Sequence, residues 1–584
     1  MFLAPLNSMA AQIGGATVHG WGHISFQDKR GVRILPRGSD DDEGTSGMTA
    51  KCGALRFLCV DEIEATGADT TGELEHNVRF HISMKNLFRY DTQGNVRMFG
   101  GVNTLFFGDF WQLRPTGQIA IMSNPFAAKA EENAKAREIM GMFWYDIPGM
   151  TLQSWHNNER VIHLDRNERS GADEWFSRVL ETCREGCLSE DDYNFLHGYP
   201  TRAQISFWYH CKGEDMHPNG PCSYTPYYIR DHWDAWPEQQ PFECVHCWQE
   251  RKRRARVLCF NTRSAHDDQE RLAAAKFANA LLITPYNIAV FYFAQQRALN
   301  FAQHTKEVCF WIQATDAPPN WWANGYTTEE LLQQKKRWLT YHARKTEGIL
   351  SLLLACVDMP YRVTDSHGWQ FREYGIHNGA KCVLKAWQLS DKDLERADTM
   401  TDGTLVLQDL PLVLFVAMQT PMKKPYPGLP DTWFPMTPVT KYWCLDADEN
   451  IDICRRGYPL VPNFSTTIDA ATGQTLDAAI PDLGDEFSLP SHHAAMRGYI
   501  ALSRVKTVDS LLIAQPFSPL LFRMGPQPWP NLLFKVLMGQ VPLQDLVPAC
   551  AEADRVNRRT AKMKETLWQC FGCQKTLAQS LEGH

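Results

Sequence analysis

The sequence predicts a protein of the α/β class with several domains. Two short apolar runs, Leu55 to Val60 and Thr104 to Phe107, are each followed closely by acidic residues. Asp61-Glu62 follows the first run, and Gly108-Asp109 follows the second. Buried parallel strands have such apolar runs, and the carboxyl ends of neighbouring strands meet at one edge of the sheet. We therefore expect an α/β sheet with a functional site at that edge.

Composition favours a globular protein. The 584 residues predict roughly three to four domains, and they are 44% hydrophobic and 22% charged. These values exclude a wholly disordered chain, a collagen-like protein and a coiled-coil protein. The longest apolar run, Ile349 to Val357, is shorter than the roughly 20 residues that a bilayer span needs, so no membrane partner is predicted.

Charge and cysteine usage limit the possible partners and the possible cellular compartments of the protein. The formal net charge of −8 gives no global positive field, although it is compatible with a local basic groove. The 17 cysteines are scattered through a long chain, which favours a reducing compartment over a disulfide scaffold. Residues 1–15 contain no Lys or Arg, so neither a secretory signal nor an Arg-rich transit segment is predicted there.

The remaining elements follow from apolar periodicity and turn residues. Glu131 to Met142 and Trp175 to Arg184 are predicted as helices, and a glycine stops the second one. Leu281 to Phe293 has the composition of a core segment. Short β-type runs between turns occupy Ile349 to Trp443 and predict a small all-β domain. Tyr499 to Leu512 is apolar and is predicted as strand-like around a Ser-Arg pair.

Several residues carry groups suited to phosphate chemistry. Asp61 could help to hold Mg²⁺ and Glu62 could polarise an attacking water, whereas two acids at a strand end are otherwise simply solvated. Gln112 could reach a γ-phosphate from the neighbouring strand. Arg169, near a domain junction, and Arg504, expected at a strand end, could stabilise negative charge in phosphoryl transfer. A surface ion pair is the alternative for each arginine.

Taken together and in this order along the chain, these motifs resemble those of the petite-integration-frequency (Pif-type) DNA helicases, a 5′-to-3′ branch of the superfamily-one helicases. The resemblance runs from residue 4 to about residue 525, and the string from Gly108 to Pro115, similar to motif III, is its most specific match. The other matches are Asp61-Glu62 to Walker B, Asn167 and Arg169 to motif IV, and Tyr499 to Val505 to motif VI, with Arg504 in the arginine-finger position.

Three further segments match the family. Ala4 to His19 resembles motif Ia, which touches DNA, and this implies that Thr17 and His19 contact DNA. Gly375 to Ala380 resembles a strand of the family's small β-barrel. Gly473 to Leu476 matches the end of motif V. The resemblance implies that Gly473, Asp61, Gln112 and Arg504 bind the nucleotide.

The resemblance also implies a division of the chain. It predicts an α/β fold of two RecA-like P-loop NTPase domains, the first truncated at its N-terminus, with an inserted small β-barrel and a Cys-rich insertion. The predicted parts are the first RecA-like domain (1–160), the start of the second (161–200), the Cys-rich insertion (201–256), the second domain continued (257–348), the β-barrel insertion (349–450), the end of the second domain (451–525) and a C-terminal tail (526–584).

The chain departs from the family in three places. The family's P-loop should lie just upstream of motif Ia, and the 584 residues contain no G-x-x-x-x-G-K-[ST] string. Asp469 to Thr472 replaces the His-Lys-Ser-Gln string of motif V, and Glu64-Ala65 replaces Ser-Met after Walker B. We expect the true reading frame to extend upstream of Met1.

The Cys-rich insertion is a candidate zinc site. Cys244 and Cys247 form a C-x2-C knuckle, and Cys211 and Cys222 lie upstream, so the four could hold one tetrahedral Zn²⁺. The alternative is a Trp- and Tyr-packed loop with free cysteines. The basic run at 251–256 that follows could hold a nucleic-acid backbone or form a solvated helix face.

The function implied by the resemblance is that of an ATP- and Mg²⁺-dependent DNA helicase. Its partners would be single-stranded and duplex DNA, and its roles would be in repair, recombination and telomere maintenance. The expected location is the nucleus, or the mitochondrion if a missing N-terminus carries a transit peptide. The chain as written is expected to be an incomplete or inactive copy. The alternatives are a non-enzymatic nucleic-acid-binding protein and a zinc-stapled interaction protein on a degenerate helicase fold.

Overall fold

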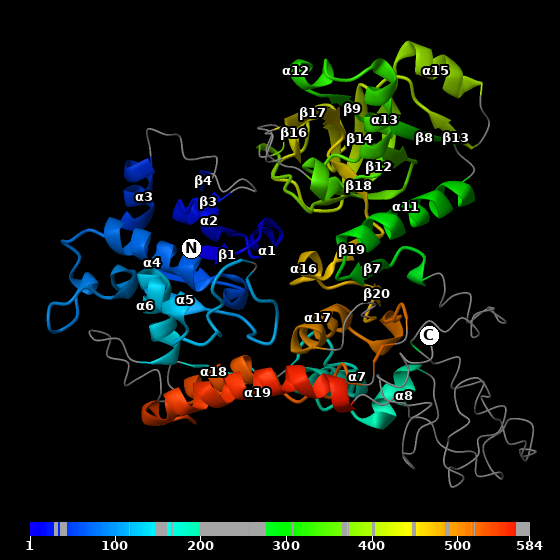
Figure 1. The fold of residues 1–584 in the computed structure, drawn as a ribbon. Helices are drawn as coiled ribbons and strands as arrows, with labels where there is room; N and C mark the ends of the chain where they lie inside the picture. The colour runs from blue at the N-terminus through cyan, green and yellow to red at the C-terminus, as the bar shows by residue number, and fades with distance from the viewer. Residues whose placement is uncertain are drawn as a thin grey trace, which may run out of the picture.

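The computed structural model describes most of the chain in separate stretches. The described residues are 1–27, 33–34, 44–115, 117–145, 161–164, 167–197, 256, 276–305, 308–364, 371, 373–399, 403–446, 451–484, 491–515, 517–518 and 520–567. They form a first core, a second core and a β-rich domain, together with two C-terminal helices (Figure 1). No helix in these stretches is both long and apolar enough to cross a membrane.

The first core is built on a four-stranded parallel sheet in the order β2-β1-β5-β6. Its strands are β1 (Phe2–Ala4), β2 (Ala16–Thr17), β5 (Phe57–Val60) and β6 (Asn103–Phe106). Leu3 pairs with Val60, and Val60 pairs with Phe106, so the carboxyl ends of these strands lie at one edge. The short elements that join them are β3 (Phe26–Gln27), β4 (Arg33–Ile34), η1 (Ile63–Ala65), η2 (Leu87–Arg89) and η3 (Met98–Gly101).

Among the described residues, helices cover one face of this sheet and leave much of the other bare. The covering helices are α2 (Val18–Gly22), α3 (Gly44–Gly53), α4 (Ala68–His81), α5 (Ala128–Glu132) and α6 (Ala134–Trp144). On the opposite face α1 (Asn7–Gln12) packs near Ala4. The apolar side chains that stay 42–57% exposed there are Phe2, Phe57, Leu105 and Phe107. Parallel sheets usually have both faces covered, so this bare face is unusual.

The second core contains a three-stranded parallel sheet in the order β19-β7-β20. The strands are β7 (Leu281–Thr284), β19 (Ser465–Thr467) and β20 (Ala479–Pro481). Its helices are α7 (Glu174–Glu185), α8 (Glu190–His197), α11 (Asn287–His304), α16 (Ile468–Ala471), α17 (His492–Leu502) and η6 (Val508–Ser510). Phe176, Ile283 and Ile500 are fully buried in its core, which therefore joins segments from distant parts of the chain.

The β-rich domain is inserted between α11 and β19. An antiparallel five-stranded sheet has the order β15-β14-β12-β11-β18, and two three-stranded sheets have the orders β10-β8-β13 and β16-β17-β9. The strands are β8 (Cys309–Gln313), β9 (Thr315–Ala317), β10 (Leu352–Ala355), β11 (Pro360–Val363), β12 (Lys381–Gln388), β13 (Thr404–Val406), β14 (Val413–Met418), β15 (Trp433–Met436), β16 (Val439–Asp446), β17 (Ile451–Gly457) and β18 (Leu460–Pro462). The helices are α12 (Asn320–Ala323), α13 (Thr328–Trp338), η5 (Ala343–Thr346) and α15 (Asp391–Asp398).

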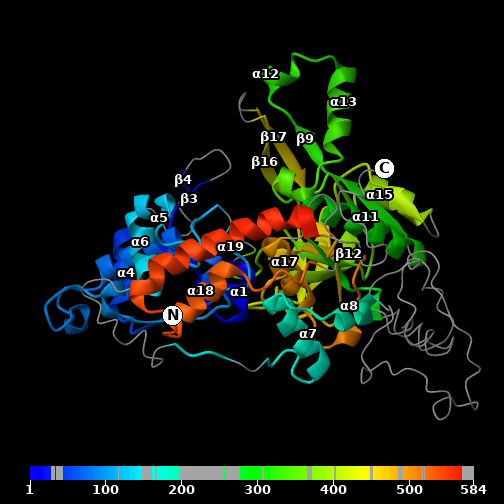
Figure 2. The ribbon, with the colours of Figure 1, turned by 60° about the horizontal axis from the view of Figure 1, so that its bottom comes forward.

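The C-terminal segment expected as a tail forms helices on the first core. These are α18 (Pro528–Leu537), η7 (Leu543–Asp545) and α19 (Leu546–Leu567). The Trp529 ring packs edge-on to Trp144 with centroids 6.0 Å apart, and the Asn124 amide donates to Asp554 at 3.0 Å. Figure 2 shows α19 running from the first core toward α17. The chain thus returns to the first core after completing the second.

Most of the elements predicted from sequence are present. The acid-bearing runs form β5 and β6, the predicted helices form α6 and α7, and Gly186, with φ 68°, ends α7. Residues 308–348 differ from the predicted boundary, because β8 pairs with β10 and so joins them to the β-rich domain. The strand expected at 499–512 is also wrong at its start. Residues 499–502 end α17, which begins where the Ser491 hydroxyl accepts from the amide of Ala494.

We predict that the first core depends on α18 for its stability. Leu533 is fully buried among first-core side chains, so Leu533→Ala should lower the free energy of unfolding by about 2–5 kcal/mol. Leu543→Ala is the matched control, because Leu543 is 49% exposed and its truncation should cost less than about 0.5 kcal/mol. Chemical denaturation measures both, and equal effects would show that α18 only rests on the surface.

Candidate functional site

Two acids lie at the carboxyl edge of the first core's sheet. Asp61 and Glu62 follow β5, and the Asp61 amide donates to the carbonyl oxygen of Leu3 on β1 at 2.9 Å. Glu62 has φ 51° and ψ 51°, a left-handed conformation that is costly for a residue other than glycine. The Ile63 amide donates to the carbonyl oxygen of Phe107 at 3.0 Å. Backbone bonds to both neighbouring strands therefore hold the two carboxylates at this edge.

Glu64 is a third acid in the same turn, and it is fully buried. Among the described residues, no donor bonds either of its carboxyl oxygens, and Oε2 of Glu62 also lacks a donor. Burial raises the pKa of Glu64 well above its ordinary value, and its hydrogen-bonded neighbour Glu62 raises it further. Ionised carboxylates only accept, so we infer that Glu64 is protonated and donates to Glu62. Glu64 was not among the site residues predicted from the sequence; its signal was a Glu where the resembled family has Ser.

The loop that follows β6, residues 108–115, brings two more polar groups to this edge. The Asp109 carboxylate accepts from the amide of Trp111 at 3.0 Å, and burial raises the pKa of Asp109. The Gln112 side chain donates to Asp109 at 3.4 Å, while its Oε1 is buried without a donor among the described residues. A Cβ on Gly108 would lie 2.1 Å from Oε2 of Glu64, so this loop packs directly on the buried acid.

Two arginines of the second core lie near these acids. Arg169 donates through Nε to Oγ1 of Thr475 and through Nη1 to the carbonyl oxygen of Ser503, both at 3.0 Å. Arg504 is 1% exposed and donates to the carbonyl oxygen of Ile500 at 2.8 Å and to the Ser503 hydroxyl at 2.7 Å. All four acceptors are neutral, and neither arginine forms an ion pair with a described carboxylate.

The arginines carry an excess of positive charge. Burial lowers the pKa of Arg504 to about 10, and the charge of Arg169 acts in the same direction. Burial also lowers the pKa of Arg169. The charge of Glu62 opposes both shifts, which indicates that the acid and the two guanidinium groups share one electrostatic neighbourhood. A bound anion would relieve the repulsion between the arginines.

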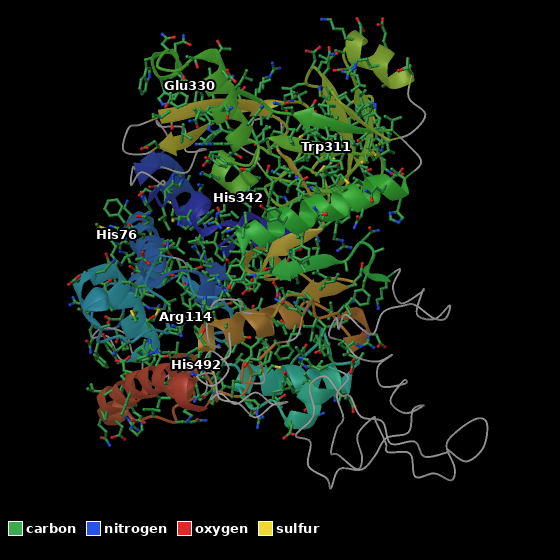
Figure 3. The ribbon with its side chains drawn as sticks, turned by 45° about the vertical axis from the view of Figure 1, so that its right-hand side comes forward. His76, Arg114, Trp311, Glu330, His342 and His492 are labelled. Carbon is green, nitrogen blue, oxygen red and sulfur yellow. The ribbon has the colours of Figure 1, made fainter. Side chains whose placement is uncertain are left out.

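The structure brings most of the predicted nucleotide-site residues together. Gly473 of the second core, with φ 75°, lies beside the first core, because a Cβ on it would be 3.8 Å from Oε1 of Glu62 and 3.5 Å from Met9. Thr475, two residues later, bonds to Arg169. Figure 3 labels Arg114 of the 108–115 loop and His492 of α17 where the two cores meet. The predicted acids, Gln112, Gly473 and the arginines thus border one junction.

The carboxylates at this junction suit a magnesium ion. Burial and the charge of Glu62 raise the pKa of Asp61, so a divalent cation would stabilise its ionised form. Mg²⁺ takes one or two carboxylates and keeps several waters, a set that Asp61 and Glu62 could supply. In the described stretches, no three His, Cys, Asp or Glu side chains are grouped to hold a metal ion. The predicted zinc ligands, Cys211, Cys222, Cys244 and Cys247, lie outside the described residues.

The two predicted DNA-contact residues lie two strands away from the acids. Thr17 ends β2 on the same carboxyl edge, and its hydroxyl accepts from the amide of Gly20 at 3.1 Å as the N-cap of α2. Burial lowers the pKa of His19, while the charge of Asp69 opposes this shift. Thr17 therefore has a helix-capping role, and a DNA contact of either residue stays a prediction.

A cavity of about 590 Å³ lies between the second core and the β-rich domain. It is lined by α11, β19 and α16 of the second core and by η5, β11 and β12 of the β-rich domain, and Leu6 and Asn7 at the start of α1 reach it from the first core. His342, which also lines it, is labelled in Figure 3. The cationic lining residues are Arg344, Arg362, Lys381 and Lys441. Glu347 is the one carboxylate among the described lining residues, so the cavity is strongly basic.

Arg362 and Lys381 form the half-buried centre of this basic cavity. Arg362 donates through Nη1 to Oγ1 of Thr466 at 2.9 Å. Burial lowers the pKa of both cations, and the charge of Arg362 lowers that of Lys381 further. Neither forms an ion pair with a described carboxylate. This pair was not predicted from the sequence; its nearest signal was the family-like segment 375–380, which precedes β12.

We predict that Glu64→Gln stabilises the protein at neutral pH. The folded state keeps the proton of Glu64 above the ordinary pKa of 4.5, where the unfolded state has released it, so stability falls as pH rises above that value. Gln preserves a donor to Glu62 without titrating. The variant should be more stable by on the order of 1 kcal/mol at pH 8 and equal to the parent near pH 4.

Thermal denaturation across this pH range measures the difference. Glu73→Gln is the control, because the Glu73 side chain is only partly buried and pairs with Lys135. A Glu64→Gln curve that runs parallel to the parent's at every pH would show that Glu64 is ionised in the folded protein.

Comparisons with known proteins give a distant likeness of fold. No family model matches the chain, and no curated protein matches its sequence. The solved Pif1 helicase from Candida albicans has a TM-score of 0.42 and 16% identity, over 88% of this chain and 83% of that one. Bacteroides Pif1 bound to ssDNA has 0.43 and 14%, over 95% and 88%. Bacteroides Pif1 with ADP-AlF3 and ssDNA also has 0.43 and 14%, over 89% and 83%. The chain is therefore similar to Pif1 helicases over most of its length, as a remote structural resemblance.

Proposed function

We propose that the chain is the nucleotide- and DNA-handling body of an ATP-dependent 5′-to-3′ DNA helicase of the Pif type, with two RecA-like domains. One observation carries the proposal. The acids at the carboxyl edge of the first core share a junction with two arginines of the second core that have no ion-pair partner among the described residues. A site split between two such bodies can couple phosphate chemistry to their relative movement.

Each group at the junction has a distinct role in this proposal. Asp61 would hold Mg²⁺, and Glu62, held by its buried neighbour Glu64, would orient and polarise the attacking water. Gln112 offers a free Oε1 in the first-core loop and would sense the terminal phosphate. Arg169 and Arg504 would stabilise the charge that develops during phosphoryl transfer. The bound Mg²⁺–ATP would supply the phosphoryl group that these residues act on.

We propose that the P-loop, which would hold the triphosphate, is a further strand and helix added to the sheet of the first core. The crossovers that run toward β6 place their helices on the covered face, and the crossover from β1 to β2 places α1 on the opposite face. This is the right-handed pattern. A strand added beside β6 and leading through a helix to β1 would therefore put that helix on the bare face of Phe2, Phe57 and Leu105. A P-loop unit has this strand–helix form.

The basic cavity is the proposed path of single-stranded DNA. Phosphates would neutralise Arg362 and Lys381. Burial lowers the pKa of both, and the charge of Arg362 lowers the pKa of Lys381 further, against the charge of Asp477. The cavity borders both the second core and the β-rich domain, so a strand held there would respond to movement between them.

A second candidate is a non-enzymatic nucleic-acid-binding protein on a degenerate helicase fold. It is favoured by the absence of a G-x-x-x-x-G-K-[ST] string from the 584 residues and by Asp469 to Thr472 in place of the motif V donors. This candidate shares the basic cavity with the first but needs no triphosphate cradle. The two differ in ATP hydrolysis.

Several finer assignments remain proposals. One is that Cys211, Cys222, Cys244 and Cys247 hold one structural Zn²⁺; metal analysis of the purified chain, with Cys244→Ser plus Cys247→Ser as the comparison, would reject it if zinc is well below one equivalent. The others are a role in DNA repair, recombination and telomere maintenance and a nuclear or mitochondrial location. Fluorescent tagging in cells tests the location.

We predict that the basic cavity binds single-stranded DNA. Arg362→Ala plus Lys381→Ala should weaken binding of a fluorescent oligonucleotide by about tenfold and should reduce the salt dependence of the affinity. Lys385→Ala is the matched control. Lys385 lies on β12 together with Lys381, but it pairs with Asp358 at 2.6 Å and does not line the cavity. Equal binding by both variants and the parent would rule out this path.

We predict that the 584-residue chain hydrolyses ATP little. A version with an added strand and helix carrying a G-x-x-x-x-G-K-[ST] string should hydrolyse ATP with DNA stimulation, because phosphoryl transfer needs the triphosphate held in line. In that version Glu62→Gln should abolish turnover while nucleotide binding persists, and Arg504→Ala should slow turnover on the order of 10³-fold. Robust ATPase of the unextended chain, lost on Glu62→Gln, would contradict the need for the added unit. No ATPase in the extended version would favour the second candidate.

A further inference from the structure

The loop at 108–115 belongs to the first core in chain order, but its side chains pack into three different bodies. Phe110 packs against Phe143 of α6, with the rings edge-on and centroids 6.2 Å apart. Both residues belong to the first core. Phe110 therefore anchors the loop to the first core, the body that contains the preceding strand β6.

Leu113, three residues later, packs in the second core. It is 8% exposed and joins the apolar cluster built from α7, α17 and β7, which includes Phe176 and Ile500. The first core thus sends one apolar side chain into the interior of the other. Separating the two cores would expose Leu113 to water.

Trp111 lies between the second core and the C-terminal helices. The guanidinium carbon of Arg184 on α7 lies 5.1 Å from the Trp111 ring centroid, a cation–π distance. On α18 the Phe534 ring meets Trp111 edge-on, with centroids 5.5 Å apart. The neighbour of Phe534, Leu533, is fully buried in the first core. Trp111 therefore contacts both bodies that flank the loop.

The other end of the loop is in contact with the acids. Gly108 leaves no room for a side chain, because a Cβ there would lie 2.1 Å from Oε2 of Glu64. The carbonyl oxygen of Phe107 accepts from the amide of Ile63 at 3.0 Å. A displacement of the loop would therefore move Ile63 and Glu64, the two residues that follow Glu62 in the turn.

We propose that Trp111 and Leu113 are positioning residues that hold the acid turn, residues 61–66, to the second core and to α18. This inference deepens the proposed function, on which its catalytic meaning rests. When the second core moves, the seated Leu113 and the Trp111 contacts shift the loop, and Gly108 passes that shift to Glu64 and Glu62. The acids then respond to the position of the second core through the backbone of this loop, in addition to the proximity of Glu62 to Gly473.

Hydrogen exchange of the full chain, without nucleotide or DNA, tests the link. Leu113→Ala and, separately, Trp111→Ala should speed amide exchange about tenfold or more in peptides that cover 61–66 and α17. Exchange in α4 should not change. Phe110→Ala is the matched control, because its ring packs in the first core; it should speed exchange in α6 and leave α17 unchanged.

Rescue and milder variants keep the result decisive. Leu113→Met, which conserves volume, should restore parent-like exchange in 61–66, and Leu113→Val replaces Leu113→Ala if that variant fails to fold. Unchanged exchange at 61–66 in the Leu113 and Trp111 variants, or an equal rise at 61–66 and α17 in Phe110→Ala, would overturn the proposal. A failure of DNA binding or ATP hydrolysis would instead count against the proposed function, because exchange is measured without either ligand.

Discussion

The two cores are held together by an exchange of apolar side chains across their junction. The first core sends Leu113 into the second, and the chain that follows the second core returns as α18 to bury Leu533 in the first. Neither core can move far without exposing a side chain that belongs to the other part of the chain, and exposure costs roughly 25 cal/mol per Å² of apolar surface. Trp111 contacts both sides of this junction.

This apolar packing contributes stability that can offset unfavourable charges at the junction. Arg504 is buried beside Arg169 with neutral oxygens as its partners, whereas Glu64, also fully buried, avoids a charge by keeping its proton. Buried charges without counter-charges reduce stability unless the surrounding packing outweighs them. Such groups gather where a ligand completes the balance, since a cation can lie between carboxylates and an anion between guanidinium groups. The acids and arginines lie on opposite sides of one junction. Such an arrangement could accept a cation on the acid side and an anion on the arginine side.

The parts that sequence could predict are those whose causes are local. An apolar run with acids at its end is enough to place Asp61 and Glu62, and the 108–115 string is distinctive in itself. Glu64 could not be found this way, because its burial is created by Gly108 of the next strand's loop. Arg362 and Lys381 alternate with buried residues on β11 and β12, a pattern equally typical of surface positions. Residues 499–502 could not be placed correctly from sequence, because a short apolar run fits either a strand or a buried helix.

One short segment borders both proposed sites and gives them a common physical basis. Thr466, at the basic cavity, accepts from Arg362, and Gly473 lies beside Glu62. Between them stand only the end of β19 and the four-residue helix α16, whose Ile468 and Ala471 are buried in the second core. A helix packed on one face moves as a rigid unit, so a shift of β19 toward or away from the β-rich domain also shifts Gly473. The apolar packing of α16 would then link the cation pair in the cavity to the acids at the junction, and no continuous chain of polar contacts between the sites is needed.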